Sequence, residues 1–320
     1  MSLTLVEGNK YSNDVLQTGV VELFVRDDPI LKRLKFKTVL GNGLTYNTET
    51  TEPTVNFYDV SDTWAESTGT VTAATVTLKI IGGDCDLDNF VMKTNSNLQD
   101  LWVELIDAKT KAMQHKWLQH FWYGYNTADT KSFNGLQYLI SDATYNSKAL
   151  GTSGTPVLLP MSSLEATIDM IKGFKPQLIM MTKTMRRSIN KYLHGVGGIT
   201  YADAANARIQ TLYDIPVGVS DEISNDESCS TTYGSDYGCT YTQGVTQTDQ
   251  NGTTIFVLNF DEKGVKGIQA GAMTIDTVAK ALETKDAQRR RIKWYSAVML
   301  QSKLACSKLS GVAPAGVVTA

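Results

Sequence analysis

The sequence predicts an α+β fold built from an arm, a long hairpin, a long helix, an α/β region and a late return to strands. Three observations support this prediction. Threonine- and valine-rich segments near the start alternate apolar and polar residues, as strands do. A long helical pattern follows them, and mixed helix and strand signals then lead back to strand patterns near the end. No internal repeat appears.

The composition is that of an ordinary globular protein with 320 residues, 42% hydrophobic and 20% charged. Its formal net charge of −3 excludes a global basic field for gripping nucleic acid, although a container for DNA needs no such field. The first residues lack the basic and apolar regions of a signal peptide. No run approaches the ~20 apolar residues of a membrane-spanning helix. We therefore expect a soluble chain that starts in the cytoplasm.

Residues 1–35 are predicted to form an N-terminal arm. They lack regular periodicity but contain the apolar patches 20–23 and 30–31. Such a segment is ordered only when it lies on another surface.

Residues 36–82 are predicted to form an extended antiparallel hairpin. The alternating segments 44–60 and 70–81 would be its strands, joined by a polar connector that contains Trp64. Because an isolated two-stranded ribbon is marginal in water, we expect something outside the hairpin to support it.

The charge of this hairpin is one-sided, since residues 38–78 contain no lysine or arginine. One interpretation is a solvated acidic loop, and the sharper one is an acidic strap that lies on a basic surface. The acidic residues are Glu49, Glu52, Asp59, Asp62 and Glu66.

Residues 83–154 are predicted to form a domain around a long helix from about 96 to 123. An apolar stripe at spacings of three and four supports the helix, and Gly124 is expected to end it. At 1.5 Å per residue the helix would be about 40 Å long. The stripe is Leu98, Leu101, Leu105, Ala108 and Ala112, widened by Trp102, Ile106, Met113 and Trp117.

Residues 155–262 read as an α/β domain, after a glycine- and serine-rich connector at 147–154. The expected elements are helices at 162–172 and 182–194, the second ended by Gly195, and strands at 176–181 and 215–219. Asn251 and Gly252 signal a turn that would pair 244–250 with 253–260. Residues 222–243 read as a polar surface loop.

Residues 263–320 are predicted to return to the domain of the long helix. Strands are expected at 265–270, 273–278 and 291–300. In the last of these, Ile292, Trp294, Val298 and Leu300 share one face.

No catalytic, cofactor or metal site is predicted. His115 and His120 are five residues apart, which does not suit two zinc ligands on one helix. Asp84, Asp86 and Asp88 alternate in a segment read as a solvated turn, with weak Ca²⁺ binding as the alternative. Phosphate-binding and serine-nucleophile motifs are absent from the sequence.

Cys229 and Cys239 flank a small polar loop and could close as a disulfide in an oxidising medium. We favour two reduced thiols, because assembly in the cytoplasm argues against early oxidation.

Two basic clusters stand out, Arg186 with Arg187 and the run Arg289, Arg290 and Arg291. They could contact DNA phosphates, acidic segments of a neighbouring subunit, or only solvent. For the second cluster we rank subunit contact first, because the acidic hairpin offers a matching partner.

The order of these elements resembles the major capsid proteins of tailed double-stranded DNA bacteriophages, with the Hong Kong ninety-seven type fold. The closing segment 282–312 is similar to that family, and so are short strings elsewhere. These strings begin at Glu22, Trp64, Phe133, Tyr213 and Thr284.

The resemblance implies a structural protein without enzymatic activity or cofactor. Copies would form hexamers and pentamers that close into an icosahedral shell around double-stranded DNA, in a virion assembled in the host cytoplasm. A scaffolding protein and a portal would be partners, and the DNA would be enclosed without sequence-specific contacts. The hairpin and the arm would each lie over a neighbouring subunit. Lysine crosslinking from the hairpin, as in some family members, is not expected here.

Two alternatives remain at this point: an encapsulin-like compartment with the same fold, and an α+β enzyme with unrecognised catalytic residues. The charge pattern adds a hypothesis about subunit contacts. One or more acids of the hairpin would meet Arg289–Arg291, or Arg186 and Arg187, of an adjacent subunit.

Overall fold

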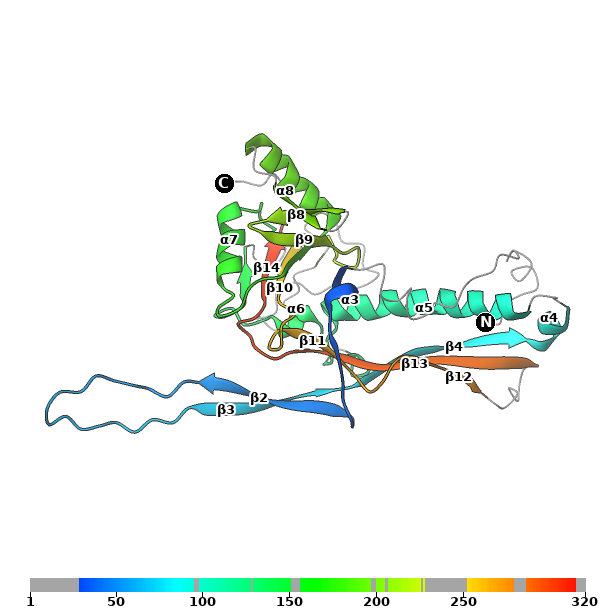
Figure 1. Cartoon of the computed structure of the whole chain (residues 1–320), viewed down its shortest axis with the longest axis horizontal. Coiled ribbons are helices and arrows are strands. Elements are labelled where there is room, and N and C mark those ends of the chain that lie inside the picture. Colours follow the sequence, from blue (N-terminus) through cyan, green and yellow to red (C-terminus); the bar gives the residue numbers. More distant parts are fainter. Residues whose placement is uncertain are drawn as a thin grey trace.

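The computed structural model describes residues 29–94, 98–127, 129–150, 156–196, 200–204, 207–225, 227, 252–278 and 286–314. These residues form helices and three sheets of five, seven and two strands, which confirms the predicted α+β class. In Figure 1 a compact part lies above a long helix and an elongated sheet, and a two-stranded hairpin projects to one side. Most of the predicted arm, residues 1–28, lies outside the described residues.

The predicted hairpin is confirmed. Strand β2 (Gly43–Thr51) pairs antiparallel with β3 (Thr70–Thr77), and Leu44 lies opposite Val76. The first strand is shorter than expected, because the ladder ends at Thr51 and not near residue 60. Pro53 follows at once and has no N–H to donate to a ladder. Residues 52–69 therefore form a long loop at the free end of the ribbon.

The predicted long helix is also confirmed, as α5 (Leu98–Tyr123). It packs on a sheet whose central member is the 14-residue strand β13 (Ala287–Leu300). One edge of β13 pairs with β4 (Lys79–Asp88), and its other edge pairs with β12 and then β11. The remaining elements of this part are β1 (Phe36–Thr38), β11 (Val265–Gln269), β12 (Thr274–Val278) and α4 (Asn89–Thr94).

The buried face of α5 differs from the predicted stripe. Ala108 and Ala112 are exposed, so that part of the prediction is wrong. The helix turns its large aromatic residues toward the sheet, because each of them removes far more apolar surface from water than an alanine does. The buried apolar residues of α5 are Leu101, Trp102, Ile106, Met113, Trp117, Leu118, Phe121 and Trp122.

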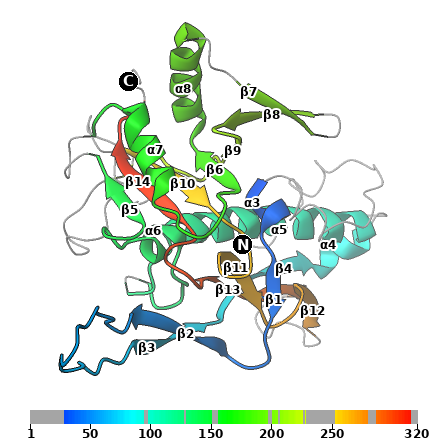
Figure 2. The same cartoon turned by 60° about the vertical axis from the view of Figure 1, so that its left-hand side comes forward.

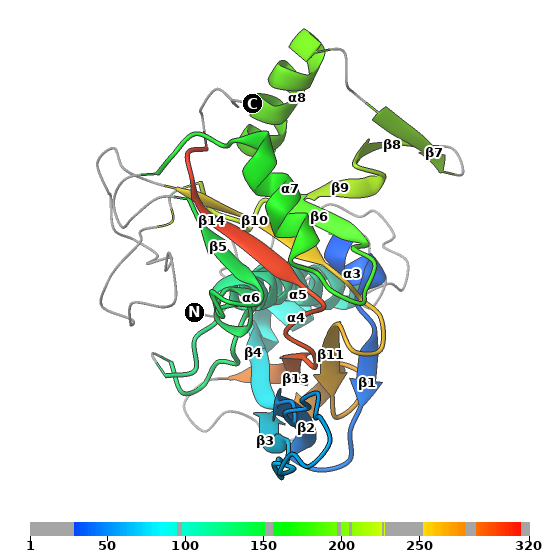
Figure 3. The same ribbon diagram turned by 90° about the vertical axis from the view of Figure 1, so that its left-hand side faces the viewer.

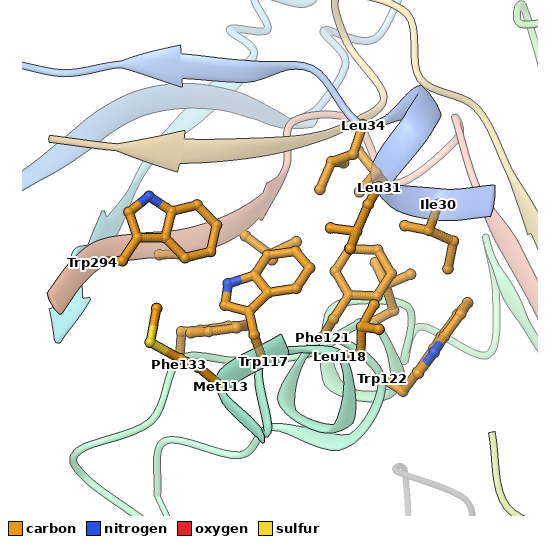
Figure 4. Close-up of a cluster of buried hydrophobic side chains, with 14 of the residues drawn as sticks. Ile30, Leu31, Leu34, Met113, Trp117, Leu118, Phe121, Trp122, Phe133 and Trp294 are labelled. Atoms are coloured by element: carbon orange, nitrogen blue, oxygen red, sulfur yellow. The ribbon is translucent and has the colours of Figure 1, made fainter. Parts of the chain in front are cut away.

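An aromatic cluster forms the centre of this core, as Figure 4 shows. The rings of Trp117 and Phe121 are stacked at 5.3 Å, and Trp294 of β13 lies 5.6 Å from Trp117. Helix α3 (Pro29–Arg33) brings Ile30 and Leu31 onto the same cluster. This end of the predicted arm therefore packs on its own chain, and the expectation that it lies over a neighbour is wrong for these residues.

Helix α5 ends at Tyr123, before Gly124, as predicted. Gly124 is not among the glycines with positive φ, so a left-handed backbone conformation does not explain the glycine. The explanation is instead the close approach of the backbone around residues 133–135. The backbone N–H of Gly135 donates to the carbonyl of Gly124 at 2.8 Å. A Cβ on Gly124 would lie 2.3 Å from the carbonyl oxygen of Phe133, so only glycine fits. The short helix α6 (Leu136–Leu139) follows.

The seven-stranded sheet forms the compact part, and α7 (Met161–Asp169) and α8 (Lys183–Val196) pack on one of its faces (Figure 3). The predicted helices and the strands near 178 and 215 are confirmed, but α8 continues through Gly195, which does not end it. The strands, in sheet order, are β5 (Ser147–Ala149), β14 (Ser307–Val312), β10 (Thr253–Leu258), β6 (Leu178–Met181), β9 (Ile215–Val219), β8 (Ala207–Leu212) and β7 (Thr200–Ala204).

Residues 263–320 were predicted to return to the domain of the long helix, but β14, which belongs to this segment, does not do so. This strand lies between β5 and β10 in the seven-stranded sheet. Strand β10 has β14 and β6 as neighbours, whereas its predicted partner 244–250 lies outside the described residues. The domain boundaries themselves stay a prediction.

Candidate interaction surfaces

The free end of the hairpin exposes large apolar side chains. Trp64 is 77% exposed and Val60 is 91% exposed, and Val55 and Phe57 are exposed as well. Trp64 stacks on Tyr58 with ring centroids 4.3 Å apart, and the backbone N–H of Ala65 donates to the Tyr58 hydroxyl. The loop thus has internal order, but none of the described residues covers it. Exposed apolar groups gathered in this way are typical of interaction surfaces.

The hairpin also carries uncompensated negative charge. Its five predicted acidic residues are all exposed, and none forms an ion pair within the part of the chain that the structure describes. Asp62 accepts a hydrogen bond of 2.6 Å from the backbone N–H of Asp59, across a turn at Ser61 with φ of 78°. The Asp59 carboxylate accepts a hydrogen bond of 2.7 Å from the backbone N–H of Val60. The five acids are Glu49, Glu52, Asp59, Asp62 and Glu66.

The second basic cluster meets its carboxylates within the chain. Arg291 donates two hydrogen bonds to Asp84, at 2.7 and 2.9 Å, and Arg289 donates two to Asp86, at 2.6 and 2.7 Å. Both pairs are direct cross-strand neighbours on β13 and β4. The Arg291 guanidinium lowers the pKa of Asp84 below its usual value, despite some opposing desolvation. Lys293 forms an ion pair with Asp276 of β12 diagonally across the ladder, because Asp276 lies opposite Arg291.

The reading of Asp84, Asp86 and Asp88 as a turn is therefore wrong. They lie on strand β4, and Asp88 accepts a hydrogen bond from the backbone N–H of Phe90 at the start of α4. The sequence carried a signal that we missed: acids at alternate positions in one strand match bases at alternate positions in another. Such a match is the usual form of cross-strand ion pairing.

Arg290 lies on the opposite face of β13 from Arg289 and Arg291, because side chains alternate along a strand. Its guanidinium carbon sits 4.4 Å from the ring centroid of Trp102 on α5. It acts as part of the packing under the helix. Whether any arginine of this run contacts another subunit stays a prediction, but Arg289 and Arg291 already have carboxylate partners.

The first basic cluster is placed differently. Arg186 and Arg187 lie on the exposed side of α8, and neither forms an ion pair within the described ranges. Lys191 is exposed on the same side, and Lys183 pairs with Asp221. The opposite side of the helix is buried against the sheet through Met185, Ile189 and Leu193.

A buried polar network lies between the end of α5 and the seven-stranded sheet. Glu227 accepts hydrogen bonds of 2.5 Å from the hydroxyls of Tyr123 and Thr254. Burial raises the pKa of Glu227 to about 7. Lys308 on β14 donates to the backbone carbonyl of Gln137 at 2.7 Å, and burial lowers its pKa to about 7. Sequence patterns did not find this network, because its members are far apart along the chain.

The remaining candidates are cysteines and histidines, and those that the structure describes form no reactive site. Cys229 and Cys239 lie outside the described residues, so their disulfide stays untested. Cys85 and Cys306 are buried free thiols, and burial raises the pKa of Cys306 to about 12. His115 pairs with Glu222 at 2.6 Å, and Nδ1 of His120 lies 2.9 Å from the carbonyl oxygen of Lys116. Among the residues described, no group of three metal-ligating side chains comes together.

Within the described ranges, no helix is both long and apolar enough to span a bilayer. The sequence matches no protein-family model and no curated protein.

Solved structures of similar fold were found along nearly the whole chain. A chain of the holo-SrpI encapsulin complex from Synechococcus elongatus PCC 7942 aligns with a TM-score of 0.65 and 11% identity, over 100% of this chain and 99% of that one. The capsid of a native GTA particle aligns with a TM-score of 0.61 and 10% identity, over 98% and 99%. The Cyanophage A-1(L) capsid aligns with a TM-score of 0.61 and 11% identity, over 94% and 97%. The chain therefore has the fold of these capsid and encapsulin proteins.

Proposed function

We propose that this chain is the major capsid protein of a tailed double-stranded DNA bacteriophage. In this proposal its copies form hexamers and pentamers, and these close into an icosahedral shell around the genome. The role is structural and not enzymatic. Support comes from the fold, which the chain shares over nearly its full length with capsids of a GTA particle and of Cyanophage A-1(L).

The observation that carries the proposal is the hairpin. It projects from the rest of the chain (Figure 1), and its loop exposes Trp64, Val60 and Phe57 to water. A two-stranded ribbon with uncovered apolar residues is poorly stable alone, so a second copy is the natural cover. Many contacts of this kind, repeated by closed symmetry, add up to a rigid shell.

The other parts of the proposal follow from shell assembly. Packaged DNA would be held by enclosure, because the net charge of −3 provides no general attraction for phosphates. A scaffolding protein and a portal are the further partners we propose. The assembled protein would reside in the virion, after assembly in the host cytoplasm.

A second candidate function is an encapsulin-like compartment that encloses protein cargo. The similarity to the encapsulin chain, with a TM-score of 0.65 over the whole of this chain, supports it. Fold alone does not separate the two candidates, because function resides in the surfaces and contents of a shell.

Expression of the full chain, followed by electron microscopy of the purified material, tests both candidates. Closed shells are expected, and a species that stays small and monodisperse at every concentration would contradict both. The contents then decide between them. Particles from phage-infected cells that contain double-stranded DNA support the capsid, whereas particles that consistently hold one protein cargo and no DNA support the compartment.

A further inference from the structure

The exposed side of α8 is the strongest unmatched positive surface that we find in the described residues. We call it the basic face and define it as Lys183, Arg186, Arg187 and Lys191. These positions lie within one arc of the helix, at spacings of three and four residues. Helix α8 contains no aspartate or glutamate, and its one ion pair in the described residues is between Lys183 and Asp221. Arg186, Arg187 and Lys191 therefore face solvent without a carboxylate partner among the described residues.

The hairpin is the matching negative surface. It carries five exposed acids and no lysine or arginine between residues 38 and 78. The alternative docking point for those acids, at Arg289 and Arg291, is already occupied by Asp86 and Asp84. Of the two arginine clusters in the sequence, only the one on α8 remains without partners among the described residues.

Within one chain these two surfaces cannot meet. Figures 1, 2 and 3 all show α8 at one extreme of the molecule and the hairpin at the other. The hairpin is held in this direction by its continuity with β4 and by the hydrogen bond from Tyr46 to the carbonyl of Leu300. A contact between them therefore requires two copies.

We infer that the basic face of α8 is the docking surface for the acidic hairpin of a second copy of this chain. The inference rests on the proposed function, because it names a contact within the assembled shell. The 14 residues of α8 span about 21 Å, and the five acids are spread along residues 49–66 of the hairpin. The contact is electrostatic at exposed side chains, so it should weaken as salt concentration rises.

A double-mutant cycle tests this pairing. One change is Arg186→Gln with Arg187→Gln, and the other replaces the five hairpin acids by their amides. In the wild-type background, loss of the arginines should raise the concentration needed for shell assembly about fivefold. In the neutral-hairpin background the same arginine change should have almost no effect. The matched control is Lys263→Gln, which removes a charge from an exposed turn elsewhere and should leave assembly unchanged in both backgrounds.

Three results would overturn the inference. The arginine change could leave assembly unaltered, or it could act equally in both backgrounds. It could also leave assembly intact but lower the nucleic-acid absorbance of the particles, which would make the basic face a polyanion site. In each case wild-type shells still form, so the proposed function survives. If wild-type protein forms no shells, the proposed function fails and the inference fails with it.

Discussion

Arg291 on β13 and Asp84 on β4 are direct cross-strand neighbours, joined by two side-chain hydrogen bonds of 2.7 and 2.9 Å. Arg289 and Asp86 repeat the arrangement two residues away. A slip of one residue between the strands would place Asp84 against Arg290, whose side chain packs under α5. The ion pairs therefore specify the register of the sheet that carries the long helix.

The first prediction concerns this pair. Asp84→Asn should lower the unfolding midpoint of the unassembled chain by about 1–2 °C at neutral pH, a small effect because both side chains are partly exposed. The folded-state pKa of Asp84 is lowered, so its stabilising effect exists above the unfolded pKa and is lost as pH falls through the folded value. Thermal melts in which the difference between variant and wild type stays undiminished as the pH falls through the acid range where Asp84 takes up its proton would contradict this account.

The second prediction concerns the buried network. The folded-state pKa of Glu227 is raised to about 7, so the folded chain keeps a proton that the unfolded chain loses from about pH 4.5 upward. Stability should therefore fall as pH rises toward 7. Glu227→Gln keeps an acceptor for Tyr123 and should remove this part of the pH dependence. Urea unfolding at about pH 5 and about pH 7 gives the change in unfolding free energy between the two pH values. If that change were the same in Glu227→Gln as in the wild type, the assignment to Glu227 would be refuted.

Lys308 provides the complement to that experiment. Its folded-state pKa is lowered to about 7, so the folded chain gives up its proton before the unfolded chain does. The contribution of Lys308 to stability should therefore rise with pH from about 7 to about 10. Lys308→Met should remove that rise and leave the effect of Glu227 below pH 7 in place, although at altered strength because the two charges interact.

The third prediction tests the close contact of two glycines at the end of α5. A Cβ on Gly135 would lie 2.5 Å from the carbonyl oxygen of His120 and 2.6 Å from the backbone nitrogen of Gly124. Gly135→Ala should therefore destabilise the chain by about 2–3 kcal/mol, through forced separation of backbone segments. Gly271→Ala is the matched control, because nothing lies within 4 Å of its added Cβ. Equal unfolding free energies for the two variants would contradict the prediction, because they would show that the backbone around Gly135 moves apart at no cost.

The fourth prediction separates folding from assembly with two tryptophans. Trp117 is fully buried and donates to the hydroxyl of Ser296 at 3.0 Å, so Trp117→Ala should cost about 3–5 kcal/mol of stability. Trp64 is 77% exposed on the hairpin, so Trp64→Ala should leave the unfolding midpoint of the unassembled chain nearly unchanged but impair shell formation. Shells of normal yield from the Trp64 variant would argue against the hairpin as a contact.

Local patterns predicted the elements well and their partners poorly. The alternation around Val76 and the helical repeat around Trp117 report burial along one segment, and both elements were confirmed. Partner choice depends on residues far apart in sequence. Arg291 and Asp84 are separated by 207 positions, and a pattern within either segment alone does not reveal the other.

The misassigned positions have physical explanations. Ala108 and Ala112 fit an apolar stripe by spacing, but the larger side chains beside them took the buried side of α5. Gly195 is a common helix terminator, yet α8 continues past it because the terminating conformation is a preference and not a requirement. The contact surfaces could be proposed from the distribution of charge in the sequence. The partner of each surface lies on another copy, so an experiment on the assembled protein identifies it.

Strand β14 lies between β5 and β10 in the interior of the seven-stranded sheet, and both neighbours precede it in the sequence. The sheet therefore closes only when β14 is inserted between two strands that lie earlier in the chain. Without β14, the facing edges of β5 and β10 would present unpaired N–H and C=O groups. Insertion of this one strand is thus the folding step on which the continuity of the whole sheet depends.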